Sequence, residues 1–133
     1  MIYCKNFSYL PALKTLPEVE EVSHSGEFEN RITAFIQVEA EDEAKDLLSR
    51  EKKLVNHLKW TARKNDTNTI ILHSFAHLSE SRASIEFTKS LFDEAEKRLQ
   101  NAGDATTQTP YGYFLDLNIN APGYSLARIW ASL

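Results

Sequence analysis

Two stretches decide the fold of this chain: TIILHSFAHLSES at Thr69–Ser81 and TPYGYFLDLNIN at Thr109–Asn120. The aliphatic run Ile70–Leu72 predicts a buried strand, which ends in polar and aromatic residues. In the second stretch Pro110 and Gly112 mark a turn. A period of two follows, with Tyr113, Leu115, Leu117 and Ile119 on one face and Phe114, Asp116, Asn118 and Asn120 on the other. Each stretch therefore predicts a strand joined to the rim of a pocket.

The composition is that of an ordinary globular protein. The chain has 133 residues, of which 42% are hydrophobic and 26% charged, with four glycines and four prolines. A chain of this length can bury a real core, so we expect one domain over residues 1–133. No run approaches the roughly 18 apolar residues of a membrane span, and no signal peptide is evident. We therefore expect a cytoplasmic protein that does not bind membranes.

Charge and cysteine content narrow the possible partners. The net charge of −4 argues against wrapping a long nucleic acid, which needs many phosphate contacts, but it permits binding of a few nucleotides at an end. The single Cys4 can form neither an internal disulfide nor a thiolate metal site. We expect it to be a small buried residue of the first strand.

Other strands are predicted on both sides of the Ile70 strand. Ile2–Tyr9 has the composition of an opening strand, closed by a loop over Pro11–Pro17, and Val19–His24 is a candidate short edge strand. From Arg31 onward, apolar residues alternate with others and predict a half-buried strand; they are Ile32, Ala34, Ile36 and Val38. Thr106–Thr109 are expected to lead into the strand at 111–120. Residues 124–130 read as a last strand or a short helix.

Two amphipathic helices are predicted. Glu41–Glu43 place negative charge at a helix start, and an apolar stripe follows at Leu47, Leu48, Leu54, Val55, Leu58 and Ala62. The basic face of this helix, with Lys45, Lys52, Lys53, Lys59, Arg63 and Lys64, is either a plain solvated face, interrupted by Asp46 and Glu51, or a phosphate-binding stripe.

The second helix follows the Ile70 strand. Its inward residues are Ile85, Thr88, Leu91, Phe92, Ala95 and Leu99, and Gly103 follows where a left-handed residue is expected. Ser79, Ser81 and Ser84 read as residues of a helix start. The order of elements favours a two-layer α/β sandwich with both helices on one side of the sheet. A ferredoxin-like sheet is the generic form of this order.

Three motifs carry a family resemblance. FAHLS (Phe75–Ser79) ends a strand, PYGYF (Pro110–Phe114) starts another, and AFIQVE (Ala34–Glu39) lies in an earlier strand. Their order and spacing resemble the N-terminal editing domain of archaeal threonyl-tRNA synthetases. The resemblance runs from about Arg31 to Trp130, while the first thirty residues fit poorly.

The resemblance implies a fold, a reaction and a site. The fold would be that of the D-aminoacyl-tRNA deacylases, an α+β two-layer sandwich with two main helices packed on a mixed sheet, assembled as a homodimer. The reaction would be hydrolysis of serine from threonine tRNA, without a metal or cofactor. The partners would be the aminoacylated 3′ end of tRNA and a threonyl-tRNA synthetase. His77 would be catalytic, and the substrate would contact Phe75, Ala76, Tyr111, Gly112, Tyr113, Phe114 and Leu115.

The chain also departs from the family pattern. The family's lysine after GYY is Leu115 here, the second tyrosine is Phe114, a glutamate near the C-terminus is Arg128, and a histidine of the opening strand is Phe7. These changes remove an ammonium and a carboxylate able to orient serine and its water. One alternative is therefore a catalytically inactive module that associates with a threonyl-tRNA synthetase. Another is a generic two-layer domain with an accidental motif match.

The motif residues also have structural interpretations. His73 and His77 stand four apart, but a strand precedes them and no third ligand is evident, which disfavours a metal site. His77 alone can be a hydrogen-bonded structural histidine. Tyr111 and Tyr113 can be strand packing, or they can offer faces and hydroxyls to a terminal base.

Overall fold

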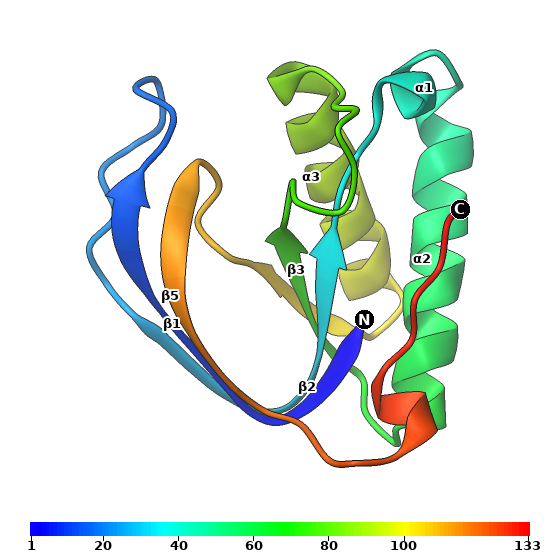
Figure 1. The fold of residues 1–133 in the computed structure, drawn as a ribbon. Helices are drawn as coiled ribbons and strands as arrows, with labels where there is room; N and C mark the ends of the chain where they lie inside the picture. The colour runs from blue at the N-terminus through cyan, green and yellow to red at the C-terminus, as the bar shows by residue number, and fades with distance from the viewer.

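A single five-stranded sheet forms the centre of the molecule, in the order β4-β3-β2-β1-β5 (Figure 1). The structure is a computed structural model that describes residues 1–133. The strands are β1 (Ile2–Lys14), β2 (Gly26–Ile36), β3 (Thr69–Ser74), β4 (Ala105–Gln108) and β5 (Tyr113–Asn120). The helices are α1 (Ala40–Glu43), α2 (Leu47–Lys64) and α3 (Ile85–Asn101), followed by the short 3₁₀ helix η1 (Ser125–Ala127).

The sheet is mixed. β1 pairs antiparallel with β2 and β5, whereas β3 lies parallel to both β2 and β4. Each parallel pair is joined through a helix, and such crossovers are almost always right-handed. Both crossovers step along the sheet in the same direction, so α2 and α3 cover the same face. The predicted two-layer α+β architecture is confirmed, and the ferredoxin-like order is wrong because of the two parallel pairs.

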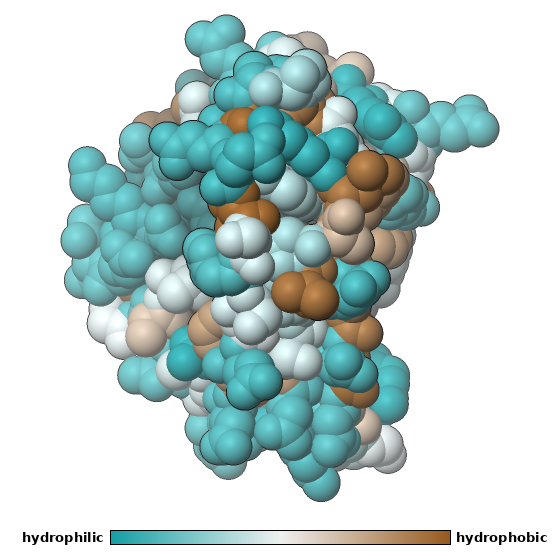
Figure 2. Space-filling view, turned by 90° about the vertical axis from the view of Figure 1, so that its left-hand side faces the viewer, coloured by the Kyte–Doolittle hydropathy of each residue, from teal (hydrophilic) through white to brown (hydrophobic).

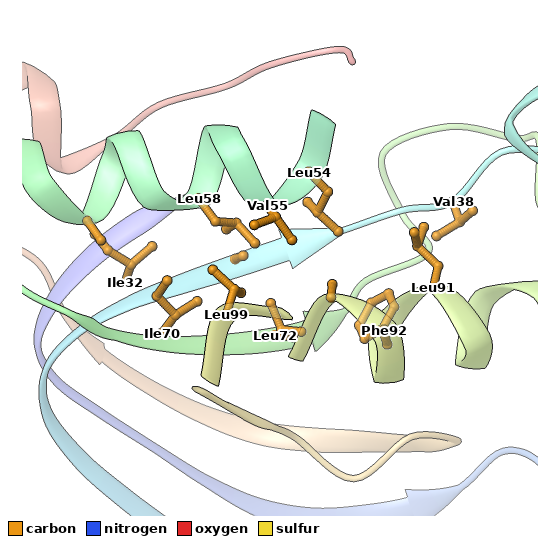
Figure 3. Packing of buried hydrophobic residues seen from close by; sticks show 13 residues of the cluster. Ile32, Val38, Leu54, Val55, Leu58, Ile70, Leu72, Leu91, Phe92 and Leu99 are labelled. Atoms are coloured by element: carbon orange, nitrogen blue, oxygen red, sulfur yellow. The ribbon is translucent and has the colours of Figure 1, made fainter. Parts of the chain in front are cut away.

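The main core lies between this helical layer and the sheet. Side chains from α2 and α3 meet those of β2 and β3 there (Figure 3). The cluster consists of Ile32, Ala34, Val38, Leu54, Val55, Leu58, Ala62, Ile70, Leu72, Leu91, Phe92, Ala95 and Leu99. The apolar stripes predicted for both helices are largely confirmed; Leu48 and Ile85 are exposed.

A second, smaller cluster joins β1, β3 and β5. It consists of Cys4, Phe7, Tyr9 and Ile71, with Leu115 and Leu117 packed against it. Thr33 of β2 is also fully buried and accepts a long hydrogen bond from the Cys4 thiol. The prediction of a half-buried β2 is therefore wrong around Thr33, because both faces are covered there. Cys4 is buried, as predicted.

β1 and β5 curve away from the helices (Figure 1). The molecule seen from their side is mostly hydrophilic, with small separate hydrophobic patches (Figure 2). The alternation predicted for β5 is confirmed, since Phe114, Asp116, Asn118 and Asn120 are exposed. The Ile119 side chain on the other face is 41% exposed near the end of the strand.

Three strand predictions need correction. β1 continues to Lys14 through Pro11, where β5 is its only neighbour, because pairing with β2 ends at Tyr9. Residues 19–24 form no strand. The segment expected to lead into the last strand instead forms β4, and β5 starts at Tyr113 rather than 111.

The ends of the helices explain further differences. Glu41–Glu43 belong to a separate short helix, α1, and α2 starts after Asp46, whose carboxylate accepts from the Ser49 N–H. Ser84 caps α3 in the same way, as predicted for a helix-start serine. Gly103 follows α3 with φ +91°, the predicted left-handed conformation. None of the helices is both long enough and apolar enough to span a membrane.

Candidate functional site

A cavity of about 420 Å³ lies between the loop after β3 and the start of β5. β3 and β5 do not pair, since β2 and β1 separate them in the sheet. They face the same cavity because the sheet curves. All eight predicted site residues line this β3–β5 cavity: Phe75, Ala76, His77, Tyr111, Gly112, Tyr113, Phe114 and Leu115.

The imidazole of His77 lies between two aromatic rings. Its centroid is 4.9 Å from that of Phe75 with the planes at 67°, and 6.1 Å from that of Phe114 with the planes at 26°. His77 is itself exposed. The two rings restrict its orientation while leaving it accessible to a ligand, as a group that contacts substrate requires.

Gln37, at the end of β2, holds the FAHLS loop. Its side-chain oxygen accepts from the N–H groups of Leu78 and Ser79 at 2.6 and 2.7 Å, and its amide nitrogen donates to the carbonyls of Ser79 and Ser81. The alternation that follows Arg31 places Gln37 among the non-apolar residues of a predicted strand and indicates no further role. The signal that could have indicated this role is the position of Gln37 in the AFIQVE motif, at the end of a strand.

Two backbone N–H groups of the same loop remain unbonded. The amides of Ala76 and His77 have no hydrogen-bond partner within the protein, although the Ala76 carbonyl accepts from Arg82. Both residues line the β3–β5 cavity. Adjacent N–H groups of this kind can donate to an oxygen that gains negative charge during acyl transfer.

His73 is a second imidazole of the cavity, and it is buried. Its Nδ1 atom is 2.9 Å from the Thr109 hydroxyl. Burial, with a smaller contribution from His77, lowers the pKa of His73 from its ordinary value of 6.5 to about 4. His73 is therefore neutral at pH 7. The sequence pattern suggested for His73 only the role of a metal ligand, which it also disfavoured.

Both tyrosines take part in structural contacts. The Tyr113 hydroxyl donates to the Glu20 carbonyl and accepts from the Val22 N–H, so it holds the 19–24 segment and is not free for a ligand. Burial raises the pKa of Tyr111, whose ring lies 6.0 Å from the Lys89 ammonium. The faces of these rings remain the parts able to contact a base.

Gly112 fixes the turn before β5. It has φ +84°, and a Cβ placed there would lie 3.0 Å from both methyl groups of Val19. Its carbonyl accepts from the Thr15 N–H at 2.7 Å. Glycine suits this position best, since both the backbone conformation and the space favour it.

The residues that depart from the family pattern do not all line the cavity. Leu115 lines the cavity and also packs against the Cys4–Phe7–Tyr9–Ile71 cluster, to which Phe7 belongs. Arg128 lies outside the cavity lining and donates to the Pro122 carbonyl. The structure has no group of three or more histidine, cysteine, aspartate or glutamate side chains placed to hold a metal ion.

The curved mixed sheet, its single helical layer and the aromatic cavity beside β3 define a small α+β domain. Over residues 1–133 the chain matches the family model described as the archaea-specific editing domain of threonyl-tRNA synthetase, and it belongs to that family. The match includes the first thirty residues, which the motifs alone did not connect to the family.

Proteins named threonine–tRNA ligase are among its relatives. The chain is 25% identical to that of Thermofilum pendens and 26% identical to that of Hyperthermus butylicus, in both cases over 97% of this chain and 21% of the relative. It is 28% identical to that of Methanosarcina mazei over 87% of this chain and 18% of the relative. The chain thus spans about a fifth of the length of these relatives.

Proposed function

We propose that the chain binds the aminoacylated 3′ end of threonine tRNA in the β3–β5 cavity and hydrolyses the ester of wrongly attached serine. The observation that carries this proposal is the His77–Phe114 contact, which joins the two motif stretches at one cavity. A volume of about 420 Å³ lies within the usual range of small-ligand sites, roughly 300–1,000 Å³. Family membership supports the same function.

The proposed reaction needs few charged groups. A water molecule adds to the ester carbonyl, the bond to the ribose oxygen breaks, and free serine and a 3′-terminal hydroxyl result. The Ala76 and His77 N–H groups would donate to the carbonyl oxygen as it gains charge, and His77 would orient the water. Because Leu115 supplies no ammonium, we expect this hydrolysis to depend on backbone donors and on the tRNA's own ribose hydroxyl.

The aromatic residues would serve the terminal adenosine. Phe114 is 51% exposed beside His77, and the Tyr111 ring lines the same cavity. Bases stack well on such rings without needing sequence-specific hydrogen bonds. Since tRNA works in the cytoplasm, the proposed function implies a cytoplasmic location. Family resemblance also favours a homodimer, which light scattering of the purified chain would test.

Deacylation of seryl threonine tRNA tests the function directly. The chain should release serine faster than the uncatalysed background, and His77→Ala should reduce this rate. His24→Ala is the matched control, because His24 is exposed and outside the cavity. Absence of both ester loss and binding in the unmodified chain would refute the proposal.

A second candidate function follows from Leu115. A catalytically inactive module that associates with a threonyl-tRNA synthetase would keep the fold and lose the ammonium, as this chain does at that position. Addition of the chain to a synthetase that lacks an editing domain distinguishes the two. Under this alternative, His77→Ala supports the synthetase as well as the unmodified chain does; under the first proposal it does not.

A further inference from the structure

The outer face of α2 carries a continuous basic stripe, made of Lys52, Lys53, Lys59, Arg63 and Lys64 around the ring of Trp60. At 3.6 residues per turn, positions 52, 59 and 63 follow one line along the helix, and positions 53, 60 and 64 follow the next. From position 52 to position 64 the stripe is about 18 Å long. It stands out in a protein whose net charge is −4.

The two acids that interrupt these basic residues in the sequence do not lie on the stripe in the structure. Glu51 is only 4% exposed and pairs with Arg98 of α3 at 2.5 Å. The Asp46 carboxylate accepts from the Ser49 N–H at the helix start. No other acid lies between Leu47 and Lys64, so the exposed face of α2 has no negative charge of its own.

The basic side chains of the stripe are also unpaired. None of the five forms an ion pair with a carboxylate, whereas Lys14, Arg98 and the buried Arg50 of α2 do. An ordinary solvated helix face commonly has acids and bases that compensate each other. Here the charge remains available to an anionic partner.

Trp60 narrows the class of partner. Its ring is 43% exposed, stacks on His57 with centroids 5.9 Å apart and planes at 8°, and lies 5.8 Å from the Lys64 ammonium. Cations that neutralise phosphates, placed beside an accessible aromatic face, are the combination with which proteins hold RNA strands. An acidic protein surface would use the cations but would give this ring no base or sugar to contact.

We propose that the basic stripe of α2 binds backbone phosphates of RNA, at nucleotides other than those that enter the β3–β5 cavity. No residue of α2 lines that cavity, and α2 lies on the other side of the molecule from β5 and the curved far end of β1 (Figure 1). The stripe therefore contacts a different part of the nucleic acid. Only the identity of this RNA as threonine tRNA rests on the proposed function.

Salt-dependent binding of two uncharged threonine tRNAs, one intact and one without its 3′-terminal nucleotides, tests the stripe. Lys52→Gln with Lys59→Gln should weaken binding of both RNAs roughly tenfold and lower the salt slope by about 1 to 2. Lys5→Gln with Lys97→Gln is the control, since both lysines are exposed, lie off the stripe and change the net charge equally. Trp60→Leu should weaken binding with little change of slope.

The outcomes separate this inference from the proposed function. Equal affinities of the stripe variant and the control variant would overturn the stripe, even if deacylation persists. So would complete loss of binding on truncation of the RNA, or an effect of the variant confined to binding of a synthetase. If the truncated RNA still binds through the stripe while no deacylation occurs, the stripe stands and the proposed hydrolysis fails.

Discussion

The imidazole of His77 and the ring of Phe114 lie nearly parallel, with centroids 6.1 Å apart. One residue follows β3 and the other belongs to β5, and these strands have no hydrogen bonds to each other. The contact therefore depends on the curvature of the sheet between them. A substitution of either ring should therefore alter the position of the other ring on the opposite side of the cavity.

Phe114→Leu should release the His77 imidazole. A leucine removes the aromatic face but keeps an apolar side chain, so the strand should persist while the ring loses one of its two neighbours. The His77 ring protons should shift in NMR spectra, whereas those of His57, stacked on Trp60, should not. Unchanged His77 resonances would mean that the two rings do not meet in solution.

Gln37→Ala should loosen the FAHLS loop. The substitution removes four hydrogen bonds and should lower the free energy of unfolding by about 2 kcal/mol. Hydrogen exchange should speed up at the Leu78 and Ser79 amides and remain slow in β3. Gln108→Ala, which removes exposed side-chain contacts to Asp93, is the control. Equal protection of both amides in the variant would contradict this role of Gln37.

Three glycine substitutions separate the two reasons for glycine at position 112, the positive φ and the lack of space for a Cβ. Gly112→Ala combines a positive φ with a crowded Cβ and should cost about 2 kcal/mol of stability or more. Gly103→Ala has the positive φ but open space, so it should cost about 1 kcal/mol. Gly123→Ala has neither and should change stability by less than about 0.5 kcal/mol. Urea unfolding measures all three, and any other order of costs would refute this explanation.

His73 should make the protein less stable in acid. In the unfolded chain it binds a proton as the pH falls below 6.5, but in the folded chain its pKa is about 4. The unfolded state therefore binds more protons between these values, and up to about 3 kcal/mol of stability present above pH 6.5 is lost as the pH falls to 4.

His73→Gln tests this acid sensitivity. Glutamine can keep a bond to the Thr109 hydroxyl and does not titrate, so the difference in unfolding free energy between pH 7 and pH 4.5 should shrink. Part of the difference should remain, because burial also lowers the pKa of His57. An identical pH dependence of variant and unmodified chain would show that His73 does not stay neutral.

Leu115→Lys should place an ammonium in the β3–β5 cavity. Since Leu115 lines the cavity and packs only partly against the second cluster, we expect a stability cost of about 1–2 kcal/mol and at least a tenfold rise in seryl-tRNA deacylation. Ile119→Lys, on the same face of β5 but outside the cavity lining, is the control for a nonspecific effect of charge. A rate that stays unchanged, or rises equally in both variants, would exclude position 115 from the reaction.

The elements with strong local patterns could be predicted from the sequence. The alternation in β5 and the apolar stripes of the helices both result from burial of one face. The spacing of apolar residues in the sequence is enough to indicate such burial. Gly103 was predictable because a left-handed residue commonly ends a helix. The meeting of the two motif stretches at one cavity was predictable, because each was expected to lead to the rim of a pocket; the roles of their residues stay predictions.

Features that depend on distant partners could not be predicted. Pro11 usually interrupts strands, yet it lies in β1 where only β5 is a neighbour and the register shifts. β4 has little apolar pattern of its own, and it forms a strand because it pairs with β3. The part played by Gln37 depends on loop amides that lie far from it in sequence, and His73 is neutral only because the folded cavity buries it.

The long antiparallel pairing of β1 with β5 joins Asn6–Lys14 to Tyr113–Asn120. During synthesis on the ribosome, the first strand must therefore wait for almost the whole chain before it acquires this neighbour. The helical layer and its core can form earlier from residues 32–99, but the wall that carries Phe114 comes last. A nascent chain halted before β5 would hold a packed core and an incomplete site, so ligand capture reports completion of the domain rather than collapse of its core.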